Sequence, residues 1–509
     1  MFYQPNDKYV WDAWCLSDGE EIHVFHLQIA PPFQFSNFEP MAHAVSSNLL
    51  DWRQEPDILT PGDDCPANEN RQCWTGCALR HDDRYWLFYT MRGTEGRFGD
   101  NTQAIGLATS DDGVVFTRHA GNPVIAPDGR LYADENEPGA VAVDFRDAVV
   151  IPSPEGGFLA YFAAQSARSG DTPSLSVIGA AKSDDLVHWE LLPPVFKARR
   201  QAVVEVPDVF FLDSKWYLTC LTGLGYHAFA CLTEPDSYYG TMYAVSDSPF
   251  GPFAELEDNT LIGTRTMAAP LSIRSFMHKG ERLAMYTDRR RVGRTNSGNL
   301  GFGVLSIPKR MRVRENRLEL VYSPIIEQAV VRTKTPDWKA VFELAEKDDW
   351  GHFGRRMPYS VHVDANGALT YSRIYDTGVL DLNWEVPGYI LEADVTLKDA
   401  EAAGFMILAG VFIRLETLSG NVVLIDDKAT LLEKRRCRIQ KDRQYNLKTI
   451  VRMEFIEVYV DDHLVLTGTW YSDKMAAGLF VEYGSAVFGN VMMRELDLTD
   501  HASSAKSPK

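Results

Sequence analysis

The 509-residue chain has little of what marks membrane, secreted or metal-binding proteins. No apolar run approaches the roughly 18 residues of a membrane-spanning helix, and no basic-then-apolar leader opens the chain, so we expect neither an anchor nor a secretion signal. The 7 cysteines are an odd number without metal-ligand spacing, which favours free thiols in a reducing cytoplasm. The sequence therefore predicts a cytoplasmic protein without a metal site.

Positive charge is also scarce. The chain has 51 Lys and Arg against 70 Asp and Glu, a net charge of -19, which argues against nucleic acid and anionic membranes as partners. Hydrophobic residues make up 45% and charged residues 24%, ordinary values for a folded protein. A chain of this length usually exceeds one core, so we expect two domains.

Helical periodicity is nearly absent, and short aromatic or apolar strands take its place. Their centres recur roughly 57 to 73 residues apart, a period typical of stacked supersecondary units. A tight polar turn that ends in an aromatic residue recurs with the same period, as in Ser183-Asp184-Asp185-Leu186 with Trp189. This pattern predicts a five-bladed β-propeller of four strands per unit. The five strands are 22–25, 85–89, 158–162, 216–218 and 283–286.

The repeat also predicts which residues share a position. Counting back 13 or 14 residues from Phe25, Phe88, Tyr161 and Leu218 gives one residue in each of four blades. Because equivalent positions on innermost strands face the central channel, we expect three carboxylates and an aromatic side chain in one pocket. Two carboxyls and an aromatic ring are typical of a glycosidase site. The four residues are Asp12, Trp74, Asp147 and Glu205.

Local context assigns roles to these acids. Glu205 follows Val203 and Val204, and apolar neighbours should raise its pKa as a general acid requires. Arg146 precedes Asp147 and could bind a sugar hydroxyl or hold Asp147 ionised by lowering its pKa. The alternatives are a glutamate that points into water and a structural Arg–Asp ion pair.

Further residues are candidates for binding substrate rather than for chemistry. Trp11 and Trp14 flank Asp12 and could hold a sugar ring, although both could be core residues. A lone Gln or His is more often a structural group, and the charged run Thr287–Arg291 more often a solvated face. The candidate substrate-binding residues are Trp11, Gln28, His43, Trp74, Thr75 and Arg146.

The last third of the chain has a different pattern. Strands that alternate with polar turns from about 349 to 498 predict a β-sandwich. We expect a propeller over 1–329, a linker over 330–348, a β-sandwich over 349–500 and a disordered tail over 501–509.

Several of these segments resemble glycoside hydrolase family 32, the invertase, inulinase and levanase family, over nearly the whole chain. Arg146-Asp147-Ala148 and Glu205-Val206-Pro207-Asp208 are similar to two family motifs with one change each. The segments 44–52, 305–311 and 457–462 also resemble family segments. The first motif, Val10-Trp11-Asp12-Ala13-Trp14, is more similar to that of the related family 68 of levansucrases.

The resemblance implies a retaining glycosidase that acts on β-fructofuranosides such as sucrose, fructo-oligosaccharides or fructan. Asp12 would be the nucleophile, Glu205 the acid/base and Asp147 the residue that holds ring hydroxyls. A retaining enzyme needs the two reacting carboxyls about 5 to 5.5 Å apart, and an inverting one about 6.5 to 9.5 Å.

Other functions remain open from the sequence. They are a fructosyltransferase that uses the same site, a propeller glycosidase of arabinanase or xylosidase type, and a silent carbohydrate-binding homologue. No cofactor is expected, because a carboxylate nucleophile and proton transfer suffice. The expected partner is a small carbohydrate, and a homodimer is left open.

Overall fold

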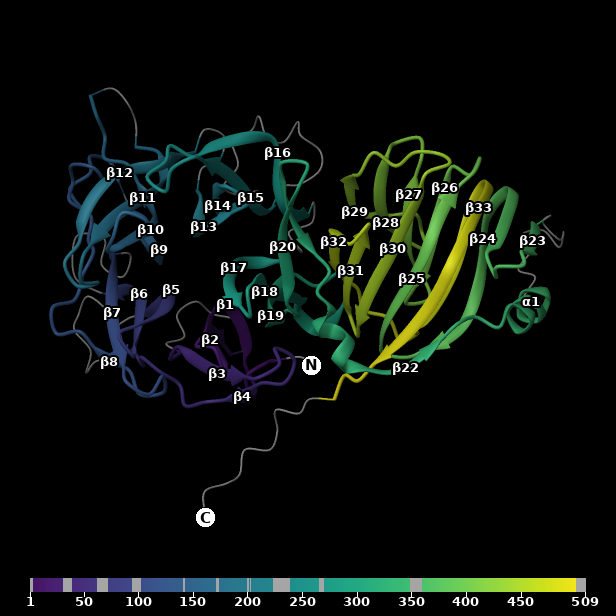
Figure 1. Ribbon diagram of the computed structural model, residues 1–509, viewed down its shortest axis with the longest axis horizontal. Coiled ribbons are helices and arrows are strands. Elements are labelled where there is room, and N and C mark those ends of the chain that lie inside the picture. The colour runs from purple at the N-terminus through teal and green to yellow at the C-terminus, as the bar shows by residue number, and fades with distance from the viewer. Residues whose placement is uncertain are drawn as a thin grey trace, which may run out of the picture.

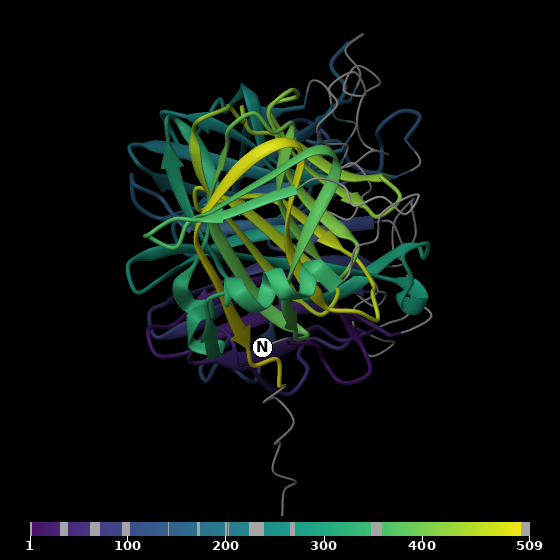
Figure 2. The ribbon, with the colours of Figure 1, turned by 90° about the vertical axis from the view of Figure 1, so that its right-hand side faces the viewer.

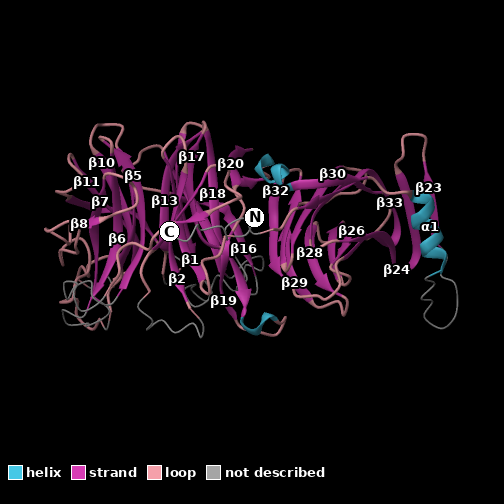
Figure 3. Ribbon diagram, turned by 90° about the horizontal axis from the view of Figure 1, so that it is seen from below, coloured by secondary structure: helices cyan, strands magenta, loops and turns pink. Residues whose placement is uncertain are grey.

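The computed structural model describes most of the chain as two parts that lie side by side (Figure 1). Strands make up nearly all of both parts, and helix is confined to short segments (Figure 3). The expected fold class, an all-β chain with a propeller followed by a sandwich, is confirmed. The described residues are 3–30, 39–61, 72–93, 102–140, 142–170, 174–198, 201, 203–222, 239–264, 270–347 and 359–499.

Antiparallel strands form the first part in consecutive groups. The strands are β1 (Tyr9–Ser17), β2 (Ile22–Ile29), β3 (Ala42–Ser46), β4 (Arg53–Gln54), β5 (Gln72–His81), β6 (Arg84–Gly93), β7 (Thr102–Ser110), β8 (Thr117–Arg118), β9 (Phe145–Pro152), β10 (Phe158–Gln165), β11 (Ser176–Ser183), β12 (Glu190–Lys197), β13 (Glu205–Leu212), β14 (Lys215–Thr222), β15 (Tyr239–Ser246), β16 (Ala254–Thr264), β17 (Leu271–His278), β18 (Glu281–Arg291), β19 (Leu300–Leu305), β20 (Lys309–Arg314) and β21 (Arg317–Val321). Three separate four-stranded sheets are β5–β8, β9–β12 and β13–β16. The strands β1–β4 and β17–β20 instead belong to one larger network, joined by the pairing of β1 with β19. The count of five blades therefore stays a prediction.

Burial explains why the middle strands of the blades read as apolar runs. β10 pairs with β9 on one side and β11 on the other, and all of its residues except the last are buried. Phe162 from this strand packs edge to face on Tyr132 and against Phe145 at 4.5 Å between ring centres. Burying an aromatic or large aliphatic side chain contributes about 1.5–3 kcal/mol, so such contacts stabilise the sheet that contains β9 and β10.

The second part is a β-sandwich, seen from its own end in Figure 2. Its strands are β22 (Val330–Lys334), β23 (Tyr359–Val363), β24 (Leu369–Glu385), β25 (Gly388–Leu397), β26 (Ala402–Ile407), β27 (Val411–Glu416), β28 (Asn421–Asp426), β29 (Leu431–Arg436), β30 (Gln444–Arg452), β31 (Phe455–Val460), β32 (His463–Thr469) and β33 (Ala476–Leu496). The first half of β33 pairs with β24 and β26, and its second half pairs with β25 and β22. This long strand therefore belongs to both layers. The core between the layers is aliphatic and aromatic, with Leu391, Phe405 and Phe488 fully buried.

The segment expected as a linker contains regular structure. β22 pairs with β33, and α1 (Trp338–Lys347) follows it. Val341 is buried on this helix, and Trp338 stacks on Phe342. The domain boundaries themselves stay predictions. The expected tail, 501–509, lies outside the described residues.

Four buried charged side chains, which we call the interdomain charge cluster, join the two parts. Arg452 of β30 binds Asp288 of β18, with 2.5 Å between Nη2 and Oδ2. Glu457 of β31 binds Lys309 of β20, with 2.8 Å between Oε1 and Nζ. Tyr459 also donates its hydroxyl to Glu457 at 2.6 Å. The cluster holds two positive and two negative groups away from water.

This cluster corrects one sequence-based expectation. The charged run Thr287–Arg291 was expected to be a solvated face, but Asp288 is 7% exposed and Thr287 is fully buried. The expectation was wrong because the partner of Asp288 lies 164 residues away, on a strand of the other domain.

Candidate active site

Each innermost strand has a β-bulge near its N-terminal end, where its pairing with the next strand shifts by one residue. β1, β5, β9, β13 and β17 each carry one extra residue relative to the next strand. Such bulges change the direction of side chains and often lie beside active sites. The irregularities fall between Val10 and Ala13, Trp74 and Gly76, Arg146 and Val149, Glu205 and Asp208, and Leu271 and Arg274.

Backbone strain accompanies three of the bulges. Asp147, Val206 and Ser272 have φ angles of 62°, 50° and 56°, in the left-handed region. For a β-branched residue such as Val206 this conformation is costly, of order 1–3 kcal/mol, and it clusters at functional sites. At the second bulge a Cβ on Gly76 would lie 1.8 Å from the carbonyl oxygen of Phe88, so only glycine fits there.

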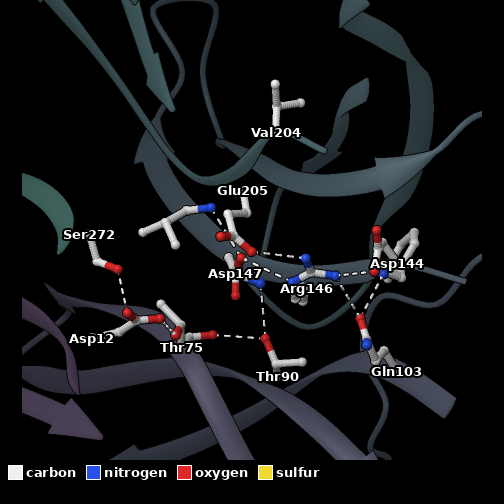
Figure 4. A network of polar contacts seen from close by, with 12 residues as sticks. Asp12, Thr75, Thr90, Gln103, Asp144, Arg146, Asp147, Val204, Glu205 and Ser272 are labelled. Atoms are coloured by element: carbon white, nitrogen blue, oxygen red, sulfur yellow. Dashed lines mark hydrogen bonds and ion pairs between the residues drawn. The ribbon is translucent and has the colours of Figure 1, made fainter. Parts of the chain in front are cut away.

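Asp12 is held by hydroxyl groups from two other blades. Thr75 donates to its Oδ2 and Ser272 donates to its Oδ1 (Figure 4). Asp12 is 7% exposed. Burial raises the pKa of Asp12, and the two hydroxyl donors oppose that rise because they stabilise the ionised form. The two hydroxyl groups therefore fix the orientation of the carboxylate, and little water reaches it.

Asp147 is fixed through its backbone and its side chain. Its amide donates to the hydroxyl of Thr90 at 2.9 Å, and its Oδ2 accepts the amide of the strained Val206 at 3.0 Å. The same Thr90 hydroxyl donates to the carbonyl of Thr75 at 2.8 Å. The strain at Val206 thus directs a backbone donor at the carboxylate, and Thr90 links the second blade to the third.

Arg146 connects the acids of the third and fourth blades. Its Nη2 lies 3.0 Å from Glu205 Oε2, its Nε lies 3.5 Å from Asp147 Oδ2, and its Nη1 donates to Asp144 (Figure 4). Gln103 accepts from the same guanidinium at 3.4 Å. The arrangement brings Asp12, Asp147 and Glu205 together around Arg146, and we call these four residues the acid cluster.

Burial dominates the electrostatics of the acid cluster. It raises the pKa of Glu205 despite the attraction of Arg146, which confirms the expected high pKa of this residue. It raises the pKa of Asp147 to about 7, and the charges of Glu205 and Asp12 add to the rise. Arg146 does lower the pKa of Asp147, as expected, but desolvation outweighs this one cation at 3.5 Å, so the expectation that Arg146 would hold Asp147 at a low pKa was wrong.

Arg274 of β17 binds the backbone of two other innermost strands beside the acid cluster. Its Nη2 donates to the carbonyl of Asp147 at 3.0 Å and its Nη1 donates to the carbonyl of Pro207. The side chain is 4% exposed. One guanidinium therefore ties together the strained backbone of three innermost strands.

Some of the expected substrate-binding residues line a small cavity beside the site. Trp11, Gln28 and Trp74 surround about 20 Å³ of space together with Glu39 and Gln72. Trp11 meets Trp74 edge to face with 6.1 Å between ring centres. Thr75 occupies the bulge of this blade and Trp74 lies immediately before it, as Glu205 does in the fourth blade.

Gln28 and His43 have structural partners. Gln28 donates to the carbonyl of Pro40 and to Asp57, both at 3.0 Å. His43 is fully buried on β3, lies 3.0 Å from the His23 ring nitrogen and stacks on Phe25. The structure does not bring His43 to the acid cluster, because β3 is not an innermost strand.

Ser272, Thr90 and Arg274 were missed in the sequence. Counting back 13 residues from Met285 in the fifth strand gives Ser272, so the repeat contained that signal. Thr90 and Arg274 act across blades, and no local pattern marks them.

Two absences hold for the described part of the chain. None of its His, Cys, Asp and Glu side chains gather in a group of three that could hold a metal ion. None of its helices has the length and apolarity to cross a membrane.

Comparisons with known proteins agree with this fold. Residues 3–255 match the family model of the glycosyl hydrolases family 32 N-terminal domain. A sucrose-6-phosphate hydrolase of Bacillus subtilis (strain 168) is 30% identical over 220 residues, which are 42% of this chain and 40% of that protein. The match thus spans less than half of the relative's length.

Solved structures show the same fold. The exo-inulinase of Aspergillus awamori superposes with a TM-score of 0.71 at 15% identity, covering 97% of this chain and 97% of that one. A family 32 β-fructofuranosidase of Bombyx mori gives a TM-score of 0.66 at 16% identity, covering 96% and 93%. At such identities the likeness concerns the fold alone.

Proposed function

Residues 3–255 belong to the N-terminal domain of glycosyl hydrolases family 32, and on this premise we propose that the chain is a retaining β-fructofuranosidase. The observation that carries the proposal is the acid cluster: three carboxyls with raised pKa values interact with one guanidinium, and two of them, Asp147 and Glu205, lie within ion-pair distance of it. Such a set of perturbed acids in a channel suits general acid/base and nucleophilic chemistry. Sucrose, its 6-phosphate and fructan fragments are the proposed substrates.

Asp12 is the proposed nucleophile. Thr75 and Ser272 occupy one lone pair on each of its oxygens and fix the carboxylate plane. A remaining lone pair attacks the anomeric carbon while the bond to the leaving oxygen breaks. Ionised Asp12 is the reactive form, and the two hydroxyl donors favour it.

Glu205 is the proposed acid/base. Its raised pKa keeps the proton that the leaving oxygen receives in the first step. In the second step the carboxylate takes a proton from water, which attacks the anomeric carbon and releases Asp12. Arg146, at 3.0 Å, stabilises the carboxylate that forms between the two steps.

Asp147 is the proposed holder of ring hydroxyls. Its Oδ2 is occupied by the amide of Val206, which leaves Oδ1 for substrate. Hydrogen bonds from ring hydroxyls would strengthen as positive charge develops on the sugar.

A product panel tests this function. We would incubate the protein with sucrose, sucrose 6-phosphate, inulin-type and levan-type oligosaccharides and identify the products by chromatography. Release of free fructose is expected from at least one substrate, accompanied by glucose 6-phosphate where the substrate is sucrose 6-phosphate. Longer oligosaccharides as the main product from concentrated sucrose would identify a fructosyltransferase instead, and cleavage of only arabinosides or xylosides would contradict the proposal.

The predicted cytoplasmic location is likewise a proposal. Its support is that the described cysteines are free thiols, as expected in a reducing compartment. These residues are Cys15, Cys73, Cys77, Cys220 and Cys437.

A further inference from the structure

A larger cavity, of about 350 Å³, lies further along the same five innermost strands. We call it the far cavity. On each of these strands the residues that line the cavity come two to five positions after the first residue of the bulge. Because a strand rises about 3.3 Å per residue, these residues lie roughly 7–16 Å from the bulge along the channel. Asp12, Asp147 and Glu205 do not line it, and Arg274 separates it from the acid cluster. Its volume falls within the range of small-molecule sites.

Two charged groups of the far cavity, Arg282 and Asp208, attract each other without a direct ion pair. Arg282 donates from Nη1 to the hydroxyl of Ser275 at 2.9 Å, and Asp208 accepts the amide of the same Ser275 on Oδ2 at 2.8 Å. Among the described residues neither side chain forms an ion pair. Asp208 is 4% exposed, and burial lowers the pKa of Arg282. Buried charges are normally paired, so a donor and an acceptor remain available side by side.

Aromatic side chains border these charges. Phe211 is 54% exposed and lies 5.4 Å from Trp216 between ring centres. Deeper in the cavity, the guanidinium of Arg282 lies over Phe210, and the indole nitrogen of buried Trp14 has no hydrogen-bond partner. The lining therefore offers apolar ring faces next to the carboxylate of Asp208 and two guanidiniums, those of Arg282 and of Arg274, which already donates to two backbone carbonyls.

We propose that the far cavity is a second binding site, for a neutral sugar, separate from the acid cluster. Adjacent sugar hydroxyls can donate to Asp208 and accept from Arg282 at once, and the apolar face of the ring can pack on Phe211 and Trp216. An anion would be repelled by Asp208 and a cation by Arg282. A neutral group with both donors and acceptors satisfies both side chains.

Calorimetric titration of Asp12→Asn with sucrose tests the site, because this variant should not consume the sugar. Two binding events per chain are expected. Phe211→Ala, added to Asp12→Asn, should weaken one of them about tenfold and leave the other unchanged. Asp208→Asn should act on the same event, and Val115→Ala, at an exposed position elsewhere, should change neither.

The outcomes separate this proposal from the proposed function. Without β-fructofuranosidase activity in the wild type, a binding event sensitive to Phe211→Ala would still support the far cavity. A single binding event whose affinity changes with neither Phe211→Ala nor Asp208→Asn would overturn the proposed far-cavity site. Binding of inorganic phosphate in place of sucrose, abolished by Arg282→Met, would also overturn it, because the site would then select an anion.

Discussion

The acid cluster and the interdomain charge cluster are both buried, yet their charges are balanced differently. In the interdomain cluster two cations face two acids, and Lys309 and Arg452 lower the pKa of Glu457 although burial alone would raise it. Burial still raises the pKa of Asp288. In the acid cluster three carboxyls share Arg146, and the pKa of every one is raised. More carboxyls than cations in a site from which water is excluded lower the stability of the folded protein. The same surplus keeps a carboxyl protonated, so that its proton is available for transfer.

The comparison implies that removing a charge should have opposite effects in the two places. In the balanced cluster the loss of one member leaves a buried charge without a partner. In the acid cluster the loss of one carboxyl relieves repulsion but removes a reacting group.

The largest effect is expected for the proposed nucleophile. Asp12→Asn keeps the size of the side chain and the folding of blade one, and it should lower kcat by about 10⁴-fold or more. Initial rates of fructose release would measure it, with Asp51→Asn, an exposed acid, as the control. Near-normal turnover in Asp12→Asn would refute the assignment of the nucleophile.

The interdomain cluster should respond in stability rather than in chemistry. Arg452→Met leaves Asp288 buried without its cation and should lower the free energy of unfolding by about 3–5 kcal/mol. Denaturant unfolding monitored by tryptophan fluorescence would measure it. Arg452→Met with Asp288→Leu removes both charges and should recover a large part of the loss.

An unchanged unfolding midpoint in Arg452→Met would show that the cluster contributes nothing to stability. A double variant no more stable than Arg452→Met would show that shape, rather than charge, controls the effect.

Arg146→Met should change the pH dependence of activity. Without the cation, the pKa of Glu205 should rise further, and the basic limb of kcat/KM should move to higher pH by about one unit or more. The rate should also fall by about 10²-fold, because the carboxylate formed at Glu205 loses its partner. A pH–rate profile with unmoved limbs would contradict the role of Arg146.

The smallest expected effect is a gain in stability from Asp147→Asn. The folded-state pKa of about 7 lies above the value of 3.8 of an unperturbed aspartate, so the folded protein binds the extra proton between these values. Wild-type stability is therefore lost as pH rises from about 4 to above 7. The neutral variant should therefore be more stable than the wild type at pH 8 and match it near pH 4. Urea unfolding at both pH values would show it, and a wild type as stable as the variant at pH 8 would contradict the raised pKa.

Local patterns and the repeat predicted much of the fold and part of the site. The spacing of aromatic strands predicted that Asp12 and Asp147 lie together, and the same count extends to Ser272. Alternation in segments such as Gly388–Leu397 predicted the sandwich, where successive residues face in and out.

The remaining features depend on contacts between distant segments. Arg274 acts on carbonyls of two other strands, and Arg452 pairs with Asp288 across the domains, so neither has a local signature. The pKa of Asp147 was misjudged because the adjacent Arg146 is visible in sequence, whereas complete burial is not. His43 was misplaced because its partner His23 lies on a neighbouring strand of the same blade.

The stereochemistry of the first product tests the central claim most directly. Sucrose would be cleaved in water that contains methanol, and the methyl fructoside would be identified by NMR. Attack by Asp12 followed by a second displacement predicts methyl β-fructofuranoside, with the configuration of sucrose retained. Methyl α-fructofuranoside would show a single displacement and contradict the assignment of Asp12 and Glu205 as nucleophile and acid/base.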